Sequence, residues 1–355
     1  MIRSSPRKRG PRLDPRLRGN ERKRLLASMF VPATRIFTAV LAALIFVSVF
    51  ARANAQDYPS RPIRLIVAFT PGGTTDITAR LIADKVQMLL GVPVAVENKP
   101  GASGAIAAQY VAQAEADGYT LFFSTVGAIA INPAFRNDLT YDPLKDFTAV
   151  GKAAINAPVL VVNADMKANS AGEFADLARK KPGAITIGIT GRGAMSDLGL
   201  QLFEASAGIQ LQSVPYRGAA QAITDILAGH LDGLVGDIPT VMAQVKAGRL
   251  KALGTTSKER SDIFPNVPTF AEQGFADAVG DNWDGVLAPA GTQPAAIAKF
   301  NAALVAALDD PALRERLHDI GTTPAPSSPE QFGSYMREEI SRWAKVIHEK
   351  GLTGE

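Results

Sequence analysis

"IVAFTPGGTTDITARLI", residues 66–82, decides the fold because it predicts a strand, a turn and a helix in immediate succession. The apolar run Ile63–Phe69 predicts a buried strand, while apolar residues from Ile77 onward recur every three or four positions, the spacing of one helix face. The two glycines of the intervening segment 71–76 let backbone N–H groups face outward at a helix N-terminus, where an anion is attracted. A tight turn capped by Asp76 is the simpler interpretation of this stretch alone.

The N-terminal residues predict an exported protein. Residues 36–51 form an apolar run followed by a small-residue site, which is typical of a signal peptide cleaved after Ala55. An uncleaved anchor is the alternative, but a membrane span needs roughly 20 apolar residues. Residues 1–28 are rich in Arg, Lys, Pro and Gly, so translation could start at Met29 rather than Met1. The sequence thus predicts a soluble periplasmic protein.

The charge and cysteine content narrow the function. The first 55 residues carry twelve of the 38 basic and two of the 34 acidic residues, so the remaining chain has a net charge of −6, whereas the full chain has +4. Nucleic-acid binding is therefore not expected. The absence of cysteine excludes disulfides and the lipid-attachment thiol of a lipoprotein.

Strand-like and helix-like segments alternate along most of the chain, which predicts a mainly parallel sheet covered by helices. A second series of this kind starts at "PVLVVN", residues 158–163, and favours two α/β domains over one long sheet. We expect residues 56–156 plus 281–355 to form domain 1 and residues 157–280 to form domain 2, with residues 1–55 removed. Trp283 should lie near the hinge or the cleft, and Trp343 on a peripheral helix.

Motifs for catalysis or cofactor binding are scarce. His230, His318 and His348 lie far apart and have no metal-ligand spacing. "GASG" at 101–104 lacks the second glycine of a nucleophile elbow, and "GITGRGAMS" at 188–196 lacks the third glycine of a dinucleotide fingerprint. No catalytic residue, metal or cofactor is expected.

The strand, turn and helix pattern recurs along the chain. It returns as "NKPGASGAI" (98–106), "STVGAIAINP" (124–133) and "TGRGAMSDL" (190–198), and more weakly as "YRGAAQAI" (216–223) and "GDIPTVM" (236–242). Turns at the carboxyl ends of strands in two α/β domains would line a cleft with inward-pointing N–H groups. The ordinary connections of an α/β protein are the alternative explanation, and they account well for residues 98–103.

From about Tyr58 onward, the chain resembles the substrate-binding receptors of tripartite tricarboxylate transporters, the Bug-type periplasmic proteins. The stretches that carry the resemblance include "YPSRPIRLIVAFTPGGTTDITAR", "VENKPGASG", "YDPLKDF", "VPYRGAAQAITDILAGHLD", "FPNVPTFAEQG" and "WDGVLAPAGT". The resemblance implies a two-domain, type II-like periplasmic-binding-protein fold with a hinged ligand cleft. It also implies a small carboxylated ligand, integral membrane transporter subunits as partners, a monomer, and no enzymatic activity.

The resemblance implies ligand contacts in four loops. These residues are Phe69, Pro71, Gly72, Gly73, Thr74, Asp76, Ser124, Thr125, Val126, Thr190, Gly191, Arg192, Gly193, Ser196 and Asp237. The sequence departs from the family pattern at Ile189 and Ala194, where hydroxyl residues are common, and at Arg192, where a small polar residue is common. We therefore hypothesise that Arg192 reaches across the cleft to a second anionic group of the ligand.

Two other classes of function are considered. A ligand-sensing adapter for a membrane signalling protein would differ only in its partner. A periplasmic enzyme would need a paired acid and base in the cleft, for which Asp76, Asp197 and Asp237 are the candidates.

Overall fold

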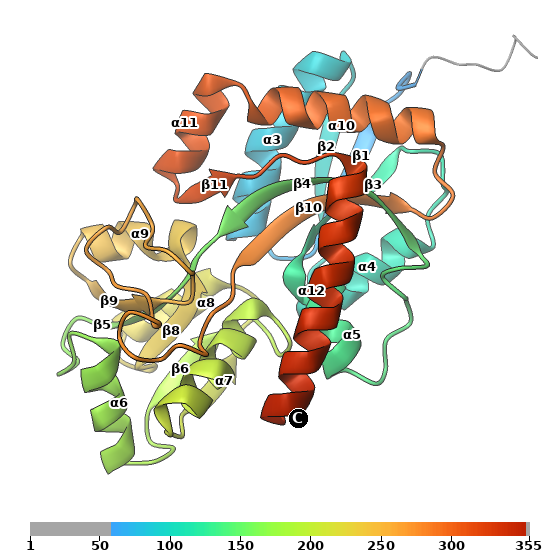
Figure 1. Cartoon of the computed structure of the whole chain (residues 1–355). Coiled ribbons are helices and arrows are strands. Elements are labelled where there is room, and N and C mark those ends of the chain that lie inside the picture. The colour runs from blue at the N-terminus through green and yellow to red at the C-terminus, as the bar shows by residue number, and fades with distance from the viewer. Residues whose placement is uncertain (1–57, 353–355) are drawn as a thin grey trace, which may run out of the picture. The chain divides into compact units, whose positions relative to one another are not determined.

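The computed structural model describes residues 58–352, in which two β-sheets are each covered by helices (Figure 1). We call the six-stranded sheet and its helices the first lobe, and the five-stranded sheet and its helices the second lobe. The predicted signal peptide, its cleavage after Ala55 and the translation start lie outside the described residues. No helix within 58–352 has both the length and the apolar character of a membrane span.

The sheet of the first lobe has the strand order β11-β4-β10-β3-β1-β2. Its strands are β1 (Ile63–Val67), β2 (Val94–Asn98), β3 (Thr120–Thr125), β4 (Phe147–Asn156), β10 (Asn282–Pro289) and β11 (Thr322–Pro324). Its helices are α3 (Thr74–Leu90), η1 (Ala102–Gly104), α4 (Ala105–Ala112), η2 (Gly127–Ile131), α5 (Asn132–Phe135), α10 (Pro294–Leu308), α11 (Pro311–Asp319) and α12 (Pro329–Lys350). Helices α3, α10 and α11 cover one face of the sheet, and α4 and α12 cover the other (Figure 1).

The sheet of the second lobe has the order β7-β6-β8-β5-β9. Its strands are β5 (Pro158–Asn163), β6 (Thr186–Ile189), β7 (Gln212–Pro215), β8 (Gly233–Asp237) and β9 (Leu250–Thr255). Its helices are α6 (Ala171–Lys180), α7 (Met195–Ala207), α8 (Ala219–Leu227) and α9 (Ile238–Lys246).

The expectation of mainly parallel sheets is wrong, because both sheets are mixed. Strand β10 pairs antiparallel with β3 and β4, and β5 pairs antiparallel with β8 and β9. The cause is the chain path. Strand β4 continues into β5 with only Ala157 between them, and β10 returns the chain to the first sheet beside β4. Strands that carry the chain out of a sheet and back run in opposite directions.

Both passages between the lobes lie close together. Asn156, the last residue of β4, is the register partner of Asn282, the first residue of β10. A short, paired connection of this kind suits a hinge, because a few residues can absorb the rotation of two rigid bodies. The domain boundaries expected from the sequence stay a prediction.

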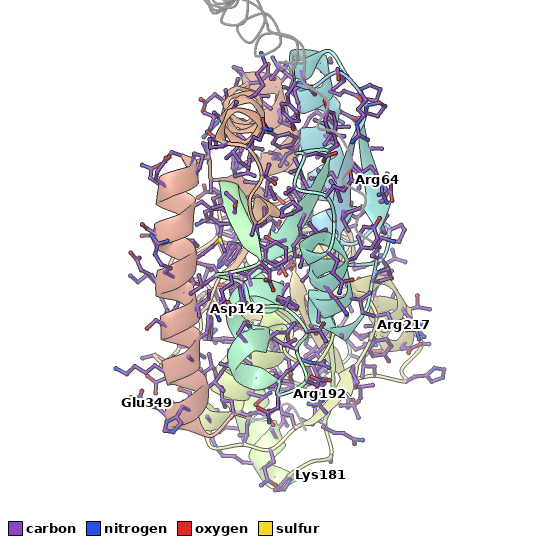
Figure 2. All side chains as sticks on the ribbon, turned by 90° about the vertical axis from the view of Figure 1, so that its right-hand side faces the viewer. Arg64, Asp142, Lys181, Arg192, Arg217 and Glu349 are labelled. Carbon is purple, nitrogen blue, oxygen red and sulfur yellow. The ribbon has the colours of Figure 1, made fainter. Side chains whose placement is uncertain are left out.

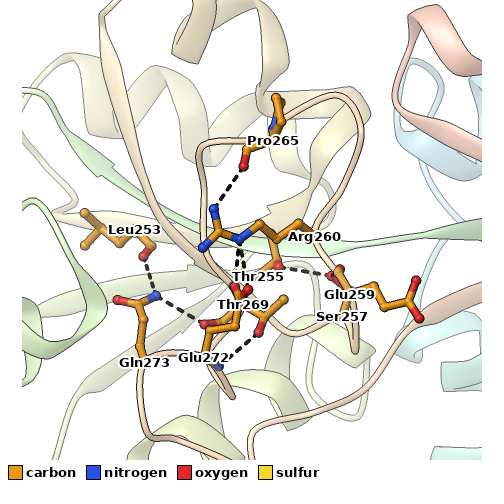
Figure 3. A network of polar contacts seen from close by, with 9 residues as sticks. All are labelled: Leu253, Thr255, Ser257, Glu259, Arg260, Pro265, Thr269, Glu272 and Gln273. Atoms are coloured by element: carbon orange, nitrogen blue, oxygen red, sulfur yellow. Dashed lines mark hydrogen bonds and ion pairs between the residues drawn. The ribbon is translucent and has the colours of Figure 1, made fainter.

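The long loop between β9 and β10 is held by its own polar network (Figure 3). The guanidinium Nε of Arg260 donates to both carboxylate oxygens of Glu272, at 3.0 and 2.9 Å. The Thr269 N–H donates to the same carboxylate, and Gln273 Nε2 donates to the Leu253 carbonyl at 2.9 Å. These bonds give the loop a fixed path without a helix or strand.

Both tryptophans are fully buried and share one acceptor. The indole N–H groups of Trp283 on β10 and Trp343 on α12 donate to the same oxygen of Glu339, Oε2, at 3.1 and 3.2 Å. The Trp283 ring packs edge-to-face against Phe332 of α12, with ring centroids 5.5 Å apart. Trp283 thus lies on the hinge strand β10, near the hinge as expected, but its ring packs against α12. The expected response of its fluorescence to ligand stays a prediction.

Candidate functional site

A cavity lies between the two lobes and is lined by the starts of helices from both. Its lining consists of Phe69, Thr70, Gly73, Thr74, Thr75, Thr125, Gly127, Thr190, Ala194, Met195, Ser196, Gly218, Ala219, Gly236, Asp237, Thr240 and Asn282. These residues include the first turns of α3, η2, α7, α8 and α9. The first turn of a helix leaves N–H groups without intrahelical acceptors and carries a partial positive charge. Converging helix starts therefore favour an anionic ligand.

The loop before α3 is shaped by Gly72 and Asp76. Gly72 has a φ of +80°, and its N–H donates to Asp76 Oδ2 at 2.9 Å. This bond closes the turn, so Gly73 becomes the N-cap and Thr74 starts the helix. Asp76 also binds the guanidinium of Arg80 and the amide of Asn98. Burial acts to raise the pKa of Asp76, but these three donors outweigh it and hold the pKa below its usual value.

The loop before α7 repeats this design in the second lobe. Gly193 has a φ of +76°, and its N–H donates to Asp197 Oδ2 at 2.9 Å. Ala194 is the N-cap. Asp197 is fully buried, and desolvation raises its pKa although Gly193, Gln201 and Arg192 oppose the shift. Both aspartates thus bind backbone within their own loops, and neither lines the cavity.

Hydroxyl groups provide further polar contacts inside the cavity. The Oγ1 atoms of Thr74 and Thr125 are buried and have no hydrogen-bond partner within the described structure. Buried hydroxyls are normally paired, so a bound molecule is a natural partner for these two. Ser196 Oγ is different, because it accepts the Thr190 N–H at 2.9 Å and lies 2.9 Å from the Thr190 hydroxyl.

The cavity has an acid at its hinge side. Asp237 caps the start of α9, and its Oδ2 accepts a 2.9 Å hydrogen bond from the Asn282 side chain. Desolvation raises the pKa of Asp237 to about 6, although Asn282 and the nearby Thr74 hydroxyl oppose the shift. The Thr74 hydroxyl approaches this carboxylate without reaching hydrogen-bond geometry. No Lys, Arg or His is found among the described residues that line the cavity.

The lobes touch each other around the cavity. The hydroxyl of Ser103 in the first lobe donates to the backbone carbonyl of Arg192 in the second. A Cβ added to Gly193 would lie 2.6 Å from Asn132 Oδ1, and one added to Gly218 would lie 2.5 Å from Thr70 Oγ1. Glycine backbone at these points lets the lobes approach closely, so the structure represents a closed arrangement.

The cavity brings together seven of the fifteen residues predicted from the sequence: Phe69, Gly73, Thr74, Thr125, Thr190, Ser196 and Asp237. The other eight lie outside its lining: Pro71, Gly72, Asp76, Ser124, Val126, Gly191, Arg192 and Gly193. The Ser124 hydroxyl donates to the Gly285 carbonyl, and Val126 is fully buried in the core. Gly72 and Gly193 shape the turns, as described above.

Arg192 lies on the surface of the second lobe, apart from Arg217 of the same lobe (Figure 2). Its side chain is 37% exposed, and its Nη1 is 3.6 Å from Asp197 Oδ1. The hypothesis that Arg192 contacts the ligand stays a prediction.

The sequence analysis did not select several lining residues as ligand contacts. Gly218 and Ala219 belong to the weak repeat "YRGAAQAI", whose pattern could have found them. Met195, Thr240 and Asn282 have no such signal, because their positions depend on how the lobes meet. No cluster of His, Cys, Asp and Glu suited to a metal ion occurs among residues 58–352.

Comparisons with known proteins support a binding role for such a site. Residues 78–352 match the family model described as "Tripartite tricarboxylate transporter family receptor". Protein BugT of Bordetella pertussis is 34% identical over 319 residues, which cover 90% of this chain and 98% of that protein.

Two solved structures with bound ligands are also similar. Rpa4515 of R. palustris with adipate is 33% identical, with a TM-score of 0.80 over 83% of this chain and 99% of that one. MatC from Rhodopseudomonas palustris with bound malate is 31% identical, with a TM-score of 0.78 over 82% and 100%. The two-domain periplasmic-binding-protein fold expected from the sequence is thereby confirmed.

Proposed function

The chain belongs to the tripartite tricarboxylate transporter receptor family, and we propose that it captures a small carboxylate in the periplasm and delivers it to integral membrane transporter subunits. The observation that carries the proposal is the cavity lined by five helix starts and by no basic side chain of the described residues. The two ligand-bound relatives hold adipate and malate, which are both dicarboxylates. We further propose that the protein acts as a monomer and does not transform its ligand.

We propose that the ligand contacts come from both lobes. In the first lobe, where the Gly73 N–H already donates to the Thr70 carbonyl at 3.3 Å, they are the N–H groups of Thr74 and Thr75 and the hydroxyls of Thr74 and Thr125. In the second they come from Thr190, Ser196 and Asp237. A hydrogen bond to a charged group contributes roughly 1.5 to 3 kcal/mol, so five or six such donors account for micromolar affinity without a buried cation. Closure of the lobes removes the site from water and strengthens each bond.

A thermal-shift screen tests the function. Mono-, di- and tricarboxylates, amino acids and aromatic acids are each added to the mature protein, because a ligand at 100 times its Kd adds about 2.7 kcal/mol to the free energy of unfolding. We expect stabilisation by small dicarboxylates, followed by calorimetry for the Kd and by chromatography to look for turnover. Stabilisation only by ligands that lack a carboxylate, or conversion of the bound acid, would contradict the proposal.

A matched pair of variants tests the site. Thr74→Val removes an unpartnered hydroxyl that lines the cavity, while Thr78→Val removes an unpartnered buried hydroxyl one turn further along α3, outside the lining. We expect the first change to weaken binding of the best dicarboxylate about 10- to 100-fold and the second by less than about twofold. Equal effects of the two changes would show that the cavity is not the binding site.

A further inference from the structure

The cavity presents an apparent conflict of charge. Its helix starts favour an anion, yet the only ionisable side chain among the described lining residues is the acid Asp237. A carboxylate ligand and an ionised Asp237 would repel each other in a site from which closure removes water, where such repulsion is stronger than in solvent.

The surroundings of Asp237 do not include a cation. From β10, the uncharged amide of Asn282 donates to Oδ2. From α3, the Thr74 hydroxyl lies close enough to affect the Asp237 carboxylate, while Asp76 and Arg80 of that helix bind each other. From α9, the Thr240 hydroxyl donates to the backbone carbonyl of Asp237.

The other charged groups near the hinge lie elsewhere. The ammonium of Lys152 on β4 lies over the Tyr335 ring of α12, at 4.0 Å from its centroid. Arg260, Asp281 and His318 line a separate groove, which includes Ala157 of the hinge but not Asp237. No positive charge on the described elements around Asp237 therefore holds it in the ionised form.

A second acid, Asp284, interacts electrostatically with Asp237. Asp284 is two residues after Asn282 on β10, is fully buried, and accepts a 2.8 Å hydrogen bond from the Asn156 amide at Oδ2. Its Oδ1 has no partner in the described structure. Burial and the charge of Asp237 raise the pKa of Asp284 well above its usual value. Two interacting acids without a cation partner do not both ionise readily, so burial and their mutual repulsion favour the protonated form on the hinge side of the cavity.

We propose that Asp237 binds the ligand as the neutral acid and donates its carboxyl proton in a hydrogen bond to a ligand carboxylate. The proton comes from solvent, so one proton is taken up for each fully ionised ligand bound above neutral pH. This inference rests on the proposed function and adds to it the protonation state in which the site accepts its ligand.

Calorimetry on the full mature protein counts the protons. The best dicarboxylate from the screen is titrated at pH 8 in two buffers of different ionisation enthalpy, and the difference in apparent binding enthalpy gives the protons bound. We expect close to one proton per ligand. Because the ligand is fully ionised between pH 7 and 9, the Kd should rise by nearly tenfold per pH unit over that range.

The variant Asp237→Asn distinguishes proton donation by Asp237 from a merely structural role of this residue. An asparagine can still accept from Asn282 and donate to the ligand, so we expect binding within about tenfold of the unchanged protein at pH 6. We expect no proton uptake and less than a twofold change in Kd from pH 7 to 9. Asp176→Asn, at an exposed acid on α6, is the control and should keep the uptake of one proton.

The outcomes are distinguishable. Binding without proton uptake in the unchanged protein would overturn the inference and leave the proposed function intact. Loss of binding in Asp237→Asn, with no uptake before the change, would overturn it in favour of an ionised Asp237 that pairs with a cationic group of the ligand. If Asp237→Asn does not fold, the proton count on the unchanged protein still decides. Failure of every carboxylate to bind would overturn both.

Discussion

The loops that start α3 and α7 have the same backbone design in the two lobes, but they shift the pKa values of their aspartates in opposite directions. In each loop a glycine at positive φ donates its N–H to the carboxylate four residues later, at 2.9 Å. Gly72 and Gly193 are equivalent, as are Asp76 and Asp197. Both aspartates brace the turn that presents helix N–H groups to the cavity.

The difference comes from burial, which is not offset at Asp197, and from the residue four positions after each aspartate. Arg80 follows Asp76 on the α3 face and binds it, whereas the neutral Gln201 occupies that place relative to Asp197. Desolvation raises the pKa of Asp197, whereas at Asp76 the bonds from Arg80, Gly72 and Asn98 outweigh desolvation and lower the pKa. The backbone fixes the shape of the anion-binding turn, and burial together with the side chain one helical turn away sets the direction of the aspartate's pKa shift.

The largest difference between the two loops should appear in ligand affinity when Gly72 or Gly193 is replaced by alanine. Both changes place a Cβ at positive φ, which costs roughly 1 to 2 kcal/mol of stability. The new Cβ in Gly72→Ala meets nothing within 4 Å, whereas in Gly193→Ala it lies 2.6 Å from Asn132 Oδ1 and 3.1 Å from Phe135 in the other lobe. We expect Gly193→Ala to lose about 100-fold in affinity for the best dicarboxylate, and Gly72→Ala less than about fivefold, by calorimetry.

Small-angle scattering with saturating ligand tests whether a loss of affinity comes from lobes that cannot close. Gly193→Ala should remain more extended than the unchanged protein, because its lobes cannot meet. Equal affinity in the two variants would mean that contact between the lobes at this loop is not needed for binding.

Replacing each aspartate by asparagine should give opposite pH dependences. The pKa of Asp76 is lowered by folding, so its carboxylate adds stability above its unfolded pKa, and this is lost as pH falls through the folded value. The pKa of Asp197 is raised, so its protonated form adds stability below the unfolded pKa, and this is lost as pH rises through the folded value.

Urea unfolding from pH 4 to 8 measures both effects. At pH 7 we expect Asp76→Asn to lower the free energy of unfolding by about 1 to 2 kcal/mol, a range that allows for screening of the half-exposed Arg80. Asp197→Asn should be nearly neutral there and become costlier as the pH falls. The same pH profile in both variants would contradict the opposite directions of the two pKa shifts.

Local sequence was sufficient to predict the strands, turns and helix starts that form much of the cavity. The pattern around residues 66–82 predicted β1, the turn and α3, and the family resemblance found from Tyr58 onward is confirmed. Glycine and hydroxyl residues after strands also indicated where the cavity would lie. These features are local, because a turn and a helix start depend on residues within one or two turns of each other.

The parts that could not be predicted depend on distant contacts. The antiparallel hinge strands β4 and β10 join residues far apart in the chain, so strand alternation suggested a parallel sheet instead. Asn282 and Thr240 enter the cavity only because the lobes meet there. For Asp76, the local sequence favoured a tight turn capped by its side chain, in agreement with the hydrogen bond from Gly72. The family resemblance implied a ligand contact, and Asp76 is not part of the cavity lining.

The smallest effect concerns Arg192, whose equivalent in the first loop is the exposed Pro71. In the closed arrangement the Arg192 guanidinium lies 3.6 Å from Asp197 and outside the cavity lining, so the geometry favours a change in Kd of less than about fivefold for Arg192→Ala. Pro71→Ala is the matched control. The hypothesis of a bidentate contact to a second ligand carboxylate predicts instead a 30- to 1,000-fold loss, from roughly 2 to 4 kcal/mol. Calorimetry with the best dicarboxylate and its monoamide decides between the two. If Arg192→Ala binds both ligands equally while Pro71→Ala still prefers the diacid, Arg192 reaches the ligand, and the second loop differs from the first in binding as well as in the pKa shift of its aspartate.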